Sequence, residues 1–343
     1  IELRMENYKK KKKELVGKNG SLSDFANGHH YYGFHQTDKG WYYREWAPGA
    51  DEMYLMGDFN GWDKTSHKMK KVKGGKFERS ARSAMDSFFG VEPFKSFKDR
   101  FNVYMASYES AEEGTDVRSA GIVKDTYFDT YCQGGGNTAS YVSDAIPVIN
   151  AVKAVVGNGD AQYYRTIAIV LVNTDEQAGS TGYPFRDYKS GFVNGYASFA
   201  IAVLAANSTG TNGLVKHEAG GHAFGRLADE YYNNGSTASS SNKSDLNNWH
   251  AKGSYWNINT SNSGNYYKFT NSAYNSSEVS FIEGGWGYNY GMYRPTQGGM
   301  MQGSTGVFNA PSRHAIYHRI ITESQGVSAY SWSNFKNYDQ KNR

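Results

Sequence analysis

Residues 217–222 read His-Glu-Ala-Gly-Gly-His, which are the residue types of a hydrolytic metal site. Neutral imidazole nitrogens bind Zn²⁺, and the ion lowers the pKa of its water to about 7. The carboxylate of Glu218, next to the first histidine, would take the proton as that water attacks a peptide carbonyl. The residue types therefore predict metal-assisted hydrolysis, with His217 and His222 as ligands and Glu218 as the general base.

The two histidines are one residue further apart than in the usual His-Glu-x-x-His pattern. On a regular α-helix, residues four apart lie about 40° apart around the axis, whereas residues five apart lie about 140° apart and cannot grip one ion. A π-bulge absorbs one residue, and Gly220 and Gly221 stand where it would fall, because glycine tolerates unusual backbone angles best. We therefore predict a distorted turn in an active-site helix over residues 216–224, with Thr211 or Asn212 as its N-cap.

A catalytic zinc keeps three protein ligands, so a third must come from elsewhere. Gly225 has the place that glycine has in the pattern His-x-x-Gly-x-x-His, where it lets the chain turn back to the metal, but position 228 is alanine. Asp229 is the best replacement and Glu230 is the alternative. The competing interpretation is a capped, solvent-facing helix end with two incidental acids.

A pair of methionines, Met300 and Met301, follows further along the chain. A methionine beneath a histidine-bound metal supplies an adaptable apolar floor, and we favour Met301 for that place; an ordinary core turn is the other interpretation. Tyr288, Tyr290 and Tyr293 precede the pair, and a phenol could steady a tetrahedral oxyanion, although packing is the more common role of tyrosine.

Together these residues resemble the IgA metallopeptidase family, which is related to the metzincins. The pattern His-Glu-x-x-Gly-His-x-Phe-Gly-x-Leu-x-Asp-Glu-Tyr carries the resemblance, and further marks follow in the right order at residues 91–95, 100–103, 299–302 and 309–313. The resemblance covers about residues 83–330. It implies an endopeptidase that binds one Zn²⁺ through His217, His222 and Asp229 and uses Glu218 as base. The chain departs from the family in having glycine where the methionine turn often has cysteine.

The first eighty residues have a different pattern. Aromatic and apolar runs at residues 41–46 and 53–56, with turn residues after each, predict short strands of an all-β immunoglobulin-like sandwich. Over about residues 10–78 the segment closely resembles the carbohydrate-binding-like module of glycogen branching enzymes, whose amylase barrel is missing here. Further strands of that module are expected after residue 78, so we expect either a fusion or missing residues near 78–83.

The aromatic residues of this module allow two interpretations. The resemblance implies that exposed Trp41 or Trp62 could stack on α-glucan rings, whereas Trp46 and Phe59 are expected to fill the sandwich core, since strand aromatics are usually buried.

The elements that must position the metal site are those of a mixed α/β (α+β), metzincin-like peptidase domain. Apolar runs predict strands at residues 101–107, 167–172 and 199–206. Apolar spacing predicts a helix at residues 144–156. We therefore predict two domains, a sandwich at residues 1–80 and a zinc peptidase at residues 81–343.

Three further segments surround these elements. Glycine-rich residues 179–182 are expected to form a loop at the rim of the cleft, and the Asn-, Ser- and Tyr-rich residues 233–280 an irregular insertion that shapes it. Residues 311–321 are expected to form a helix, in which Arg313, His314 and His318 are packing or surface residues rather than ligands.

Composition argues against several other classes of protein, namely membrane-spanning, nucleic-acid-binding and disulfide-rich proteins. The chain has 343 residues and no run of eighteen apolar ones, so we expect no membrane span. The net charge is +4, and the lysines at 9–13 are interpreted as a solvated face rather than a nucleic-acid site. Cys132 is the one cysteine of the sequence, which excludes an internal disulfide framework. A signal peptide is not evident, and a mature form would also lack one, so we expect a secreted or cell-surface protein.

The main hypothesis is thus a zinc-dependent endopeptidase that acts on a protein or peptide substrate. The alternative is a catalytically inactive peptidase fold that serves as a glycan-binding surface.

Overall fold

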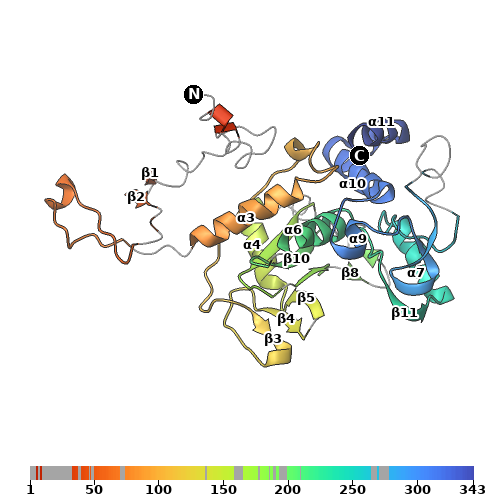
Figure 1. Cartoon of the computed structure of the whole chain (residues 1–343), viewed down its shortest axis with the longest axis horizontal. Coiled ribbons are helices and arrows are strands. Elements are labelled where there is room, and N and C mark those ends of the chain that lie inside the picture. The colour runs from red at the N-terminus through yellow and green to blue at the C-terminus, as the bar shows by residue number, and fades with distance from the viewer. Residues whose placement is uncertain are drawn as a thin grey trace. The chain divides into compact units, whose positions relative to one another are not determined.

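A computed structural model describes residues 5–6, 8–9, 33–37, 40–45, 47, 50–69, 74–135, 137–157, 165–176, 178–184, 186–187, 191–192, 199–208, 210–263, 269 and 278–343 (Figure 1). The chain divides into two compact units, residues 1–72 and 73–343. Helix α3 (Gly74–Phe88) runs through residue 80. Across the ranges given, no helix combines the length and the apolar character needed to cross a bilayer.

The first unit contains a two-stranded hairpin. Strand β2 (Gly40–Arg44), which lies within the predicted strand at residues 41–46, pairs antiparallel with β1 (Gly33–Thr37). The predicted strand at residues 53–56 is wrong for the described part, since this segment makes only an isolated bridge between Tyr54 and Lys68. Among the described residues, no further pair of residues extends this bridge into a strand.

The aromatic side chains of this unit are largely exposed. Trp41 and Trp62 are 66% and 59% exposed, and Phe59 is also 59% exposed rather than buried. The prediction that Phe59 fills a core is wrong here, because the described residues of the unit form no second sheet that could cover it. Trp46 lies outside the described residues.

The second unit has a mixed α/β fold built from small sheets. The apolar runs at residues 167–172 and 199–206 form β6 (Ile167–Val172) and β10 (Ala200–Ala205), which are parallel neighbours, as predicted. All six residues of β10 are buried, because both faces of the strand are covered. Its even-numbered residues pack toward the active-site helix, and Ile201 and Val203 pack toward Val148 of α4 (Ile146–Val156), the helix predicted at 144–156.

Two predictions around this sheet are wrong. Residues 179–182 form strand β7 (Gly179–Gly182) instead of a loop, because their backbone pairs antiparallel with β10. Residues 101–107 form no strand: Phe101 packs its ring against the rings of Phe88, Phe89 and Phe94, while the following residues are exposed and have no neighbouring ladder among the described strands.

The active-site helix begins as α6 (Thr211–Leu214) and continues as η6 (Val215–Phe224). The predicted N-cap is wrong, since Gly210 precedes the helix without a side-chain cap. The Thr211 hydroxyl instead donates to the carbonyl oxygens of Ala205 and Ser208. Helix α3 packs along α6 and η6, and β10 lies against η6 from another side (Figure 1).

Residues 233–280 were predicted to be irregular, and this is wrong for part of the segment. They contain most of β11 (Tyr232–Thr237) and the helix α7 (Ser240–Ala251). Helix α7 forms in a polar sequence because Ser239 and Asn242 make a reciprocal capping box and Leu246 and Trp249 are buried.

The remaining elements complete the second unit, whose other three-stranded sheets have the orders β3-β4-β5 and β11-β13-β12. Their bounds are β3 (Asp116–Val117), β4 (Thr130–Gly134), β5 (Asn137–Val142), β8 (Arg186–Asp187), β9 (Gly191–Phe192), β12 (Ile282–Gly285), β13 (Gly287–Arg294), α9 (Met300–Gly303), α10 (Ala310–Gln325) and α11 (Trp332–Asn342). Helix α10 contains the predicted helix at residues 311–321. Its Arg313 pairs with Asp339 of α11, and its His314 bonds the Tyr330 hydroxyl, so both pack the helix as predicted.

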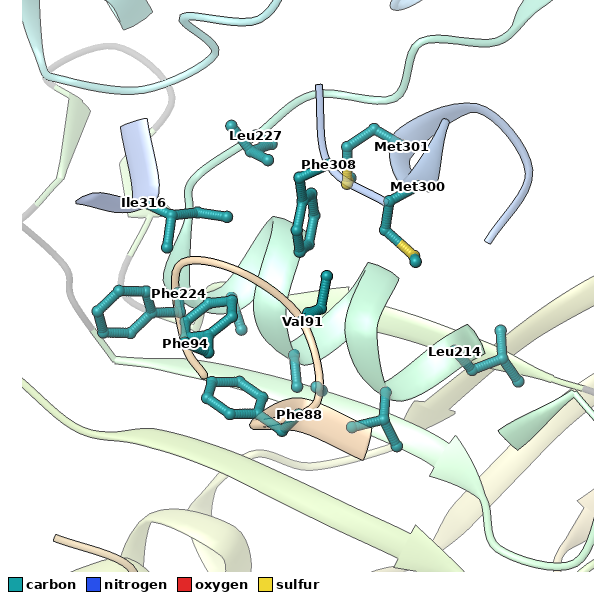
Figure 2. Packing of buried hydrophobic residues seen from close by; sticks show 14 of the residues in the cluster. Phe88, Val91, Phe94, Leu214, Phe224, Leu227, Met300, Met301, Phe308 and Ile316 are labelled. Carbon is teal, nitrogen blue, oxygen red and sulfur yellow. The ribbon is translucent and has the colours of Figure 1, made fainter. Parts of the chain in front are cut away.

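The main hydrophobic cluster surrounds η6 (Figure 2). It joins segments far apart in the sequence: Phe88 and Phe94 from one side of the helix, and Met300, Met301 and Phe308 from another. The position of the helix that carries the candidate ligands therefore depends on packing against several distant segments of the chain.

Candidate metal centre

The distortion predicted between the histidines is present and extends over the whole segment. Residues Val215–Phe224 form a π-helix of ten residues, whose N–H groups bond to carbonyls five positions back. At its end the Gly225 N–H donates to the Gly220 carbonyl at 2.9 Å. Because residues five apart share one face of such a helix, the rings of His217 and His222 meet, with centroids 4.8 Å apart.

The two glycines of this helix serve a purpose other than the predicted one. Neither Gly220 nor Gly221 has a positive φ, so their backbone is open to any residue. A Cβ at Gly221 would lie 2.2 Å from Sδ of Met301, and a Cβ at Gly220 would lie 3.1 Å from a ring carbon of Phe94. Gly221 is therefore needed for close packing against Met301, the contact at Gly220 is milder, and neither glycine is needed for backbone freedom.

Three donor atoms converge beside the helix. His217 Nε2 lies 3.1 Å from His222 Nε2 and 3.1 Å from Asp229 Oδ1, and His222 Nε2 lies 3.2 Å from the same oxygen. A tetrahedral zinc with bonds of about 2.0–2.1 Å holds its ligand atoms roughly 3.3 Å apart. The triangle of donor atoms therefore has the size that a zinc ion requires, and it is the one group of this kind within the described ranges.

The contact of Nδ1 in each ring determines which ring nitrogen carries the hydrogen. Nδ1 of His217 lies 2.7 Å from the Met300 carbonyl oxygen, and Nδ1 of His222 lies 2.8 Å from the Leu227 carbonyl oxygen. A carbonyl oxygen can only accept, so each Nδ1 carries the hydrogen and each neutral ring presents a lone pair at Nε2. When both rings are neutral, two lone pairs and a carboxylate oxygen face one another, and either a metal ion or a proton on one ring must lie between them. This donor set fits zinc.

The titration behaviour agrees with a centre that attracts positive charge. Burial alone would lower the pKa of His222, but the Asp229 carboxylate outweighs it and raises the pKa to about 9. Burial would raise the pKa of Asp229, yet the two imidazoles hold it well below its ordinary value. Asp229 is thus ionised at neutral pH and available as a ligand.

Glu218, the predicted base, lies on the same helix and is 7% exposed. The hydroxyl of Thr181, on the strand β7, donates to Glu218 Oε2 at 2.9 Å. The strand that was predicted as a loop therefore orients this carboxylate.

Glu230, the alternative third ligand, lies outside the triangle. Its carboxylate is fully buried and accepts hydrogen bonds from Asn257 Nδ2 at 2.9 Å and from Asn309 Nδ2 at 2.8 and 2.9 Å. Burial raises its pKa to about 7, against the opposing effect of the two amides and of Arg294. Both oxygens are engaged, so Asp229 supplies the third donor atom.

Both candidate methionines are 1% exposed on α9. The Met300 carbonyl holds His217, and the Met301 carbonyl accepts the backbone N–H of Glu230 at 2.8 Å. The Met301 side chain packs on the helix at Gly221. The predicted methionine turn thus contacts His217 through its backbone and the active-site helix through the Met301 side chain.

The tyrosines form two groups. Tyr288, Tyr290 and Tyr293 lie on β13. Tyr183, which was not predicted as a site residue, donates its hydroxyl hydrogen to the His222 carbonyl at 2.6 Å, and its burial raises its pKa, so it stays neutral. Burial and the neighbouring Asp229 carboxylate raise the pKa of Tyr231.

The sequence reasoning assigned no role at the site to four residues, Thr181, Tyr183, Asn257 and Asn309, the last of which appeared only within the family mark at residues 309–313. Only Asn309 carried a local signal, since an asparagine two residues before Pro311 is typical of a helix N-cap. The other three are brought to the centre by tertiary contacts alone.

Two imidazoles, one aspartate and an adjacent glutamate on a mixed α/β unit form the kind of centre that metal-dependent hydrolases use. The family described as IgA Peptidase M64 matches residues 70–270, which is more than half of the chain. The chain belongs to this peptidase family, as its motifs indicated.

A second description, carbohydrate-binding module 48 (isoamylase N-terminal domain), matches residues 31–91, which begin in the first unit and extend into helix α3 of the second. The chain is 47% identical over 64 residues to a 1,4-alpha-glucan-branching enzyme of Dictyostelium discoideum, which is 19% of this chain and 9% of that protein. It is 43% identical over 75 residues to the enzyme of Felis catus, 21% of this chain and 11% of that protein. The chain spans only about a tenth of these relatives, and the resemblance to their module is confirmed.

Proposed function

We propose that the protein is a zinc-dependent endopeptidase that cleaves a protein or peptide substrate. The observation that carries the proposal is the triangle of His217 Nε2, His222 Nε2 and Asp229 Oδ1, with sides of 3.1–3.2 Å and with both Nδ1 atoms committed to carbonyl oxygens. Membership of a peptidase family supports hydrolysis of peptide bonds.

The residues around the triangle have defined roles in this proposal. A zinc ion held there would polarise the substrate carbonyl and acidify a water molecule. Glu218 accepts the proton of the attacking water and then passes it to the leaving amine. The Thr181 hydroxyl lies 2.9 Å from Glu218 Oε2 and 3.0 Å from the Glu218 carbonyl oxygen, and in this proposal it orients the carboxylate.

The arrangement also supports a metzincin-like fold for the second unit. The active-site helix ends at Gly225, where a Cβ would lie 2.9 Å from the Gly221 carbonyl oxygen and 2.9 Å from a carbon of Ile316. Gly225 is therefore required by close packing, while the left-handed residue after it, at which the chain turns toward Asp229, is Arg226 with a φ of 53°. The methionine turn lies against the same helix.

The experiment replaces Glu218 by glutamine in the full chain. Zinc content, measured by mass spectrometry, should stay near one ion per chain, while peptide cleavage falls by about 10²–10⁴-fold because the proton acceptor is lost. Glu323→Gln, a partly exposed residue paired with Arg165, is the matched control and should cleave normally. Zinc-free wild-type protein, or unchanged cleavage by Glu218→Gln, would contradict the proposal.

A second function, binding of α-glucan by the first unit, is favoured by the exposure of Trp41 and Trp62 and by the match to a carbohydrate-binding module. Flat indole faces stack on sugar rings. The full-length protein should be retarded on glycogen in affinity electrophoresis, and W41A or W62A should weaken this, whereas the exposed Tyr104→Ala in the second unit should not. A secreted or cell-surface location suits both functions and remains a proposal.

A further inference from the structure

Glu230 joins its own segment to three others that are distant in the sequence, two through its buried carboxylate and one through its backbone N–H. Asn257 Nδ2 and Asn309 Nδ2 hold its oxygens, and its backbone N–H donates to the Met301 carbonyl at 2.8 Å. Met301 follows Met300, whose carbonyl holds Nδ1 of His217 at 2.7 Å. The same turn of backbone therefore fixes one histidine and the segment that carries Asp229.

Asn257 adds a second restraint on that segment. Its side-chain oxygen accepts the Ala228 N–H at 2.9 Å, and its Nδ2 donates to the Ala228 carbonyl at 2.8 Å, as a neighbouring strand would. The residue before Asp229 and the residue after it are thus both held by one amide, so Asp229 has little freedom to approach or leave the histidines.

Asn309 links the same carboxylate to the C-terminal part of the unit. Its Oδ1 accepts the Ser312 N–H at 3.1 Å and so caps α10, while its Nδ2 faces Glu230. One side chain thereby couples the position of a long buried helix to the segment next to the third donor atom.

We propose that Glu230 is a positioning residue whose carboxylate, clasped by Asn257 and Asn309, sets the distance of Asp229 from the two histidines and thereby the affinity for zinc. The inference rests on the proposed zinc site and deepens it, because it names what tunes that site. Residues that orient metal ligands typically contribute about 10–100-fold in metal affinity.

The test exchanges donors and acceptors inside the clasp. Glu230→Gln keeps the size of the side chain but replaces one acceptor oxygen by an NH₂ group. The hydrogens of this group then face the amide hydrogens of the asparagines, so two donors meet. Asn309→Asp keeps the oxygen that caps α10 but brings a carboxylate against Glu230. Each variant should weaken zinc binding by about 10–100-fold, measured in the full chain by competition with a fluorescent zinc chelator. In E230Q/N309D donor and acceptor face each other again with their places exchanged, and the affinity should recover to within about fivefold of the wild type.

A purely structural role would give a different result. Phe335→Leu, a fully buried change on α11, should lower the melting temperature of the metal-stripped protein yet leave the zinc affinity unchanged. Wild-type affinity in Glu230→Gln, or no recovery in E230Q/N309D, would overturn the inference alone. Zinc binding without proteolysis by the wild type would overturn only the endopeptidase, and a wild type that binds no zinc would overturn both.

Discussion

The packing of Met301 against the active-site helix makes a matched pair of substitutions informative. Gly221→Ala would place a Cβ 2.2 Å from Met301 Sδ and 2.8 Å from its Cε, whereas Gly220→Ala meets its nearest neighbour, a ring carbon of Phe94, at 3.1 Å. Both glycines lie in the same π-helix, so the gain from the greater helix propensity of alanine, about 1 kcal/mol, is common to the two variants. The difference between them therefore isolates the steric contact with Met301.

The magnitude follows from the burial of Met301, which is 1% exposed and cannot swing into solvent. Overpacking of a closed core costs about 1–3 kcal/mol, and a 2.2 Å contact belongs at the upper end of that range, about 2–3 kcal/mol. After the gain of about 1 kcal/mol from helix propensity, Gly221→Ala should be destabilised by a net ~1–2 kcal/mol. Gly220→Ala should lie within about 0.5 kcal/mol of the wild type, because a gap of a few tenths of an ångström is relieved by a small ring shift. Thermal unfolding of the zinc-loaded protein measures both, and Gly221→Ala should melt several degrees below Gly220→Ala.

A double variant tests the cause. Met301→Ala alone should cost about 2–5 kcal/mol through the cavity that it leaves. In G221A/M301A the new methyl group fills part of that cavity, so the combined cost should fall short of the sum by about 1 kcal/mol or more. Equal melting temperatures for Gly220→Ala and Gly221→Ala, or strictly additive costs in the double variant, would refute the assignment of the glycines to close packing.

Three other perturbations have defined outcomes. Thr181→Val should lower kcat by about tenfold with little change in KM, since it removes the hydrogen bond that orients Glu218, while Thr181→Ser should restore the rate; equal kcat values for both would contradict this. Because the pKa of His222 is raised to about 9 without an ion, the metal-free centre holds a proton at pH 7, and zinc binding should release about one proton there and fewer as the pH rises through 9. Calorimetry in buffers of different ionisation enthalpy measures the number of protons released. A constant release from pH 7 to 10 would argue against His222 as a zinc ligand. Asp339→Ala strands the buried Arg313 guanidinium and should cost about 3–5 kcal/mol in chemical denaturation without altering zinc affinity, and a cost below about 1 kcal/mol would show that the pair is dispensable.

The geometry of the candidate site was predictable where it depended on local spacing. Two histidines five residues apart can share an ion only if the helix is widened, so the distortion followed from the sequence, as did the choice of Asp229 before Glu230. The buried strands β6 and β10 were equally predictable from the sequence, because a short run of β-branched and small apolar residues is typical of a buried strand.

The rest of the site was hidden because it depends on contacts between distant segments. Residues 179–182 contain two glycines and resemble a loop, yet pairing with β10 makes them a strand and brings Thr181 to Glu218. Gly221 was expected to relieve backbone strain, whereas Met301, 80 positions further along the chain, is what requires the missing side chain. Asn257 lies in a segment rich in asparagine, and nothing in its neighbours distinguishes it from the others.

The hold of the Met300 carbonyl on His217 spans 83 positions, and this has a consequence for biosynthesis. A nascent chain that has left the ribosome only as far as residue 230 already carries all three donor side chains, but its first imidazole is not yet oriented and the clasp has no Asn309. Maturation of the centre must therefore await emergence of the C-terminal helices. In the function proposed above, a growing polypeptide would gain cleavage activity only after the second unit has folded.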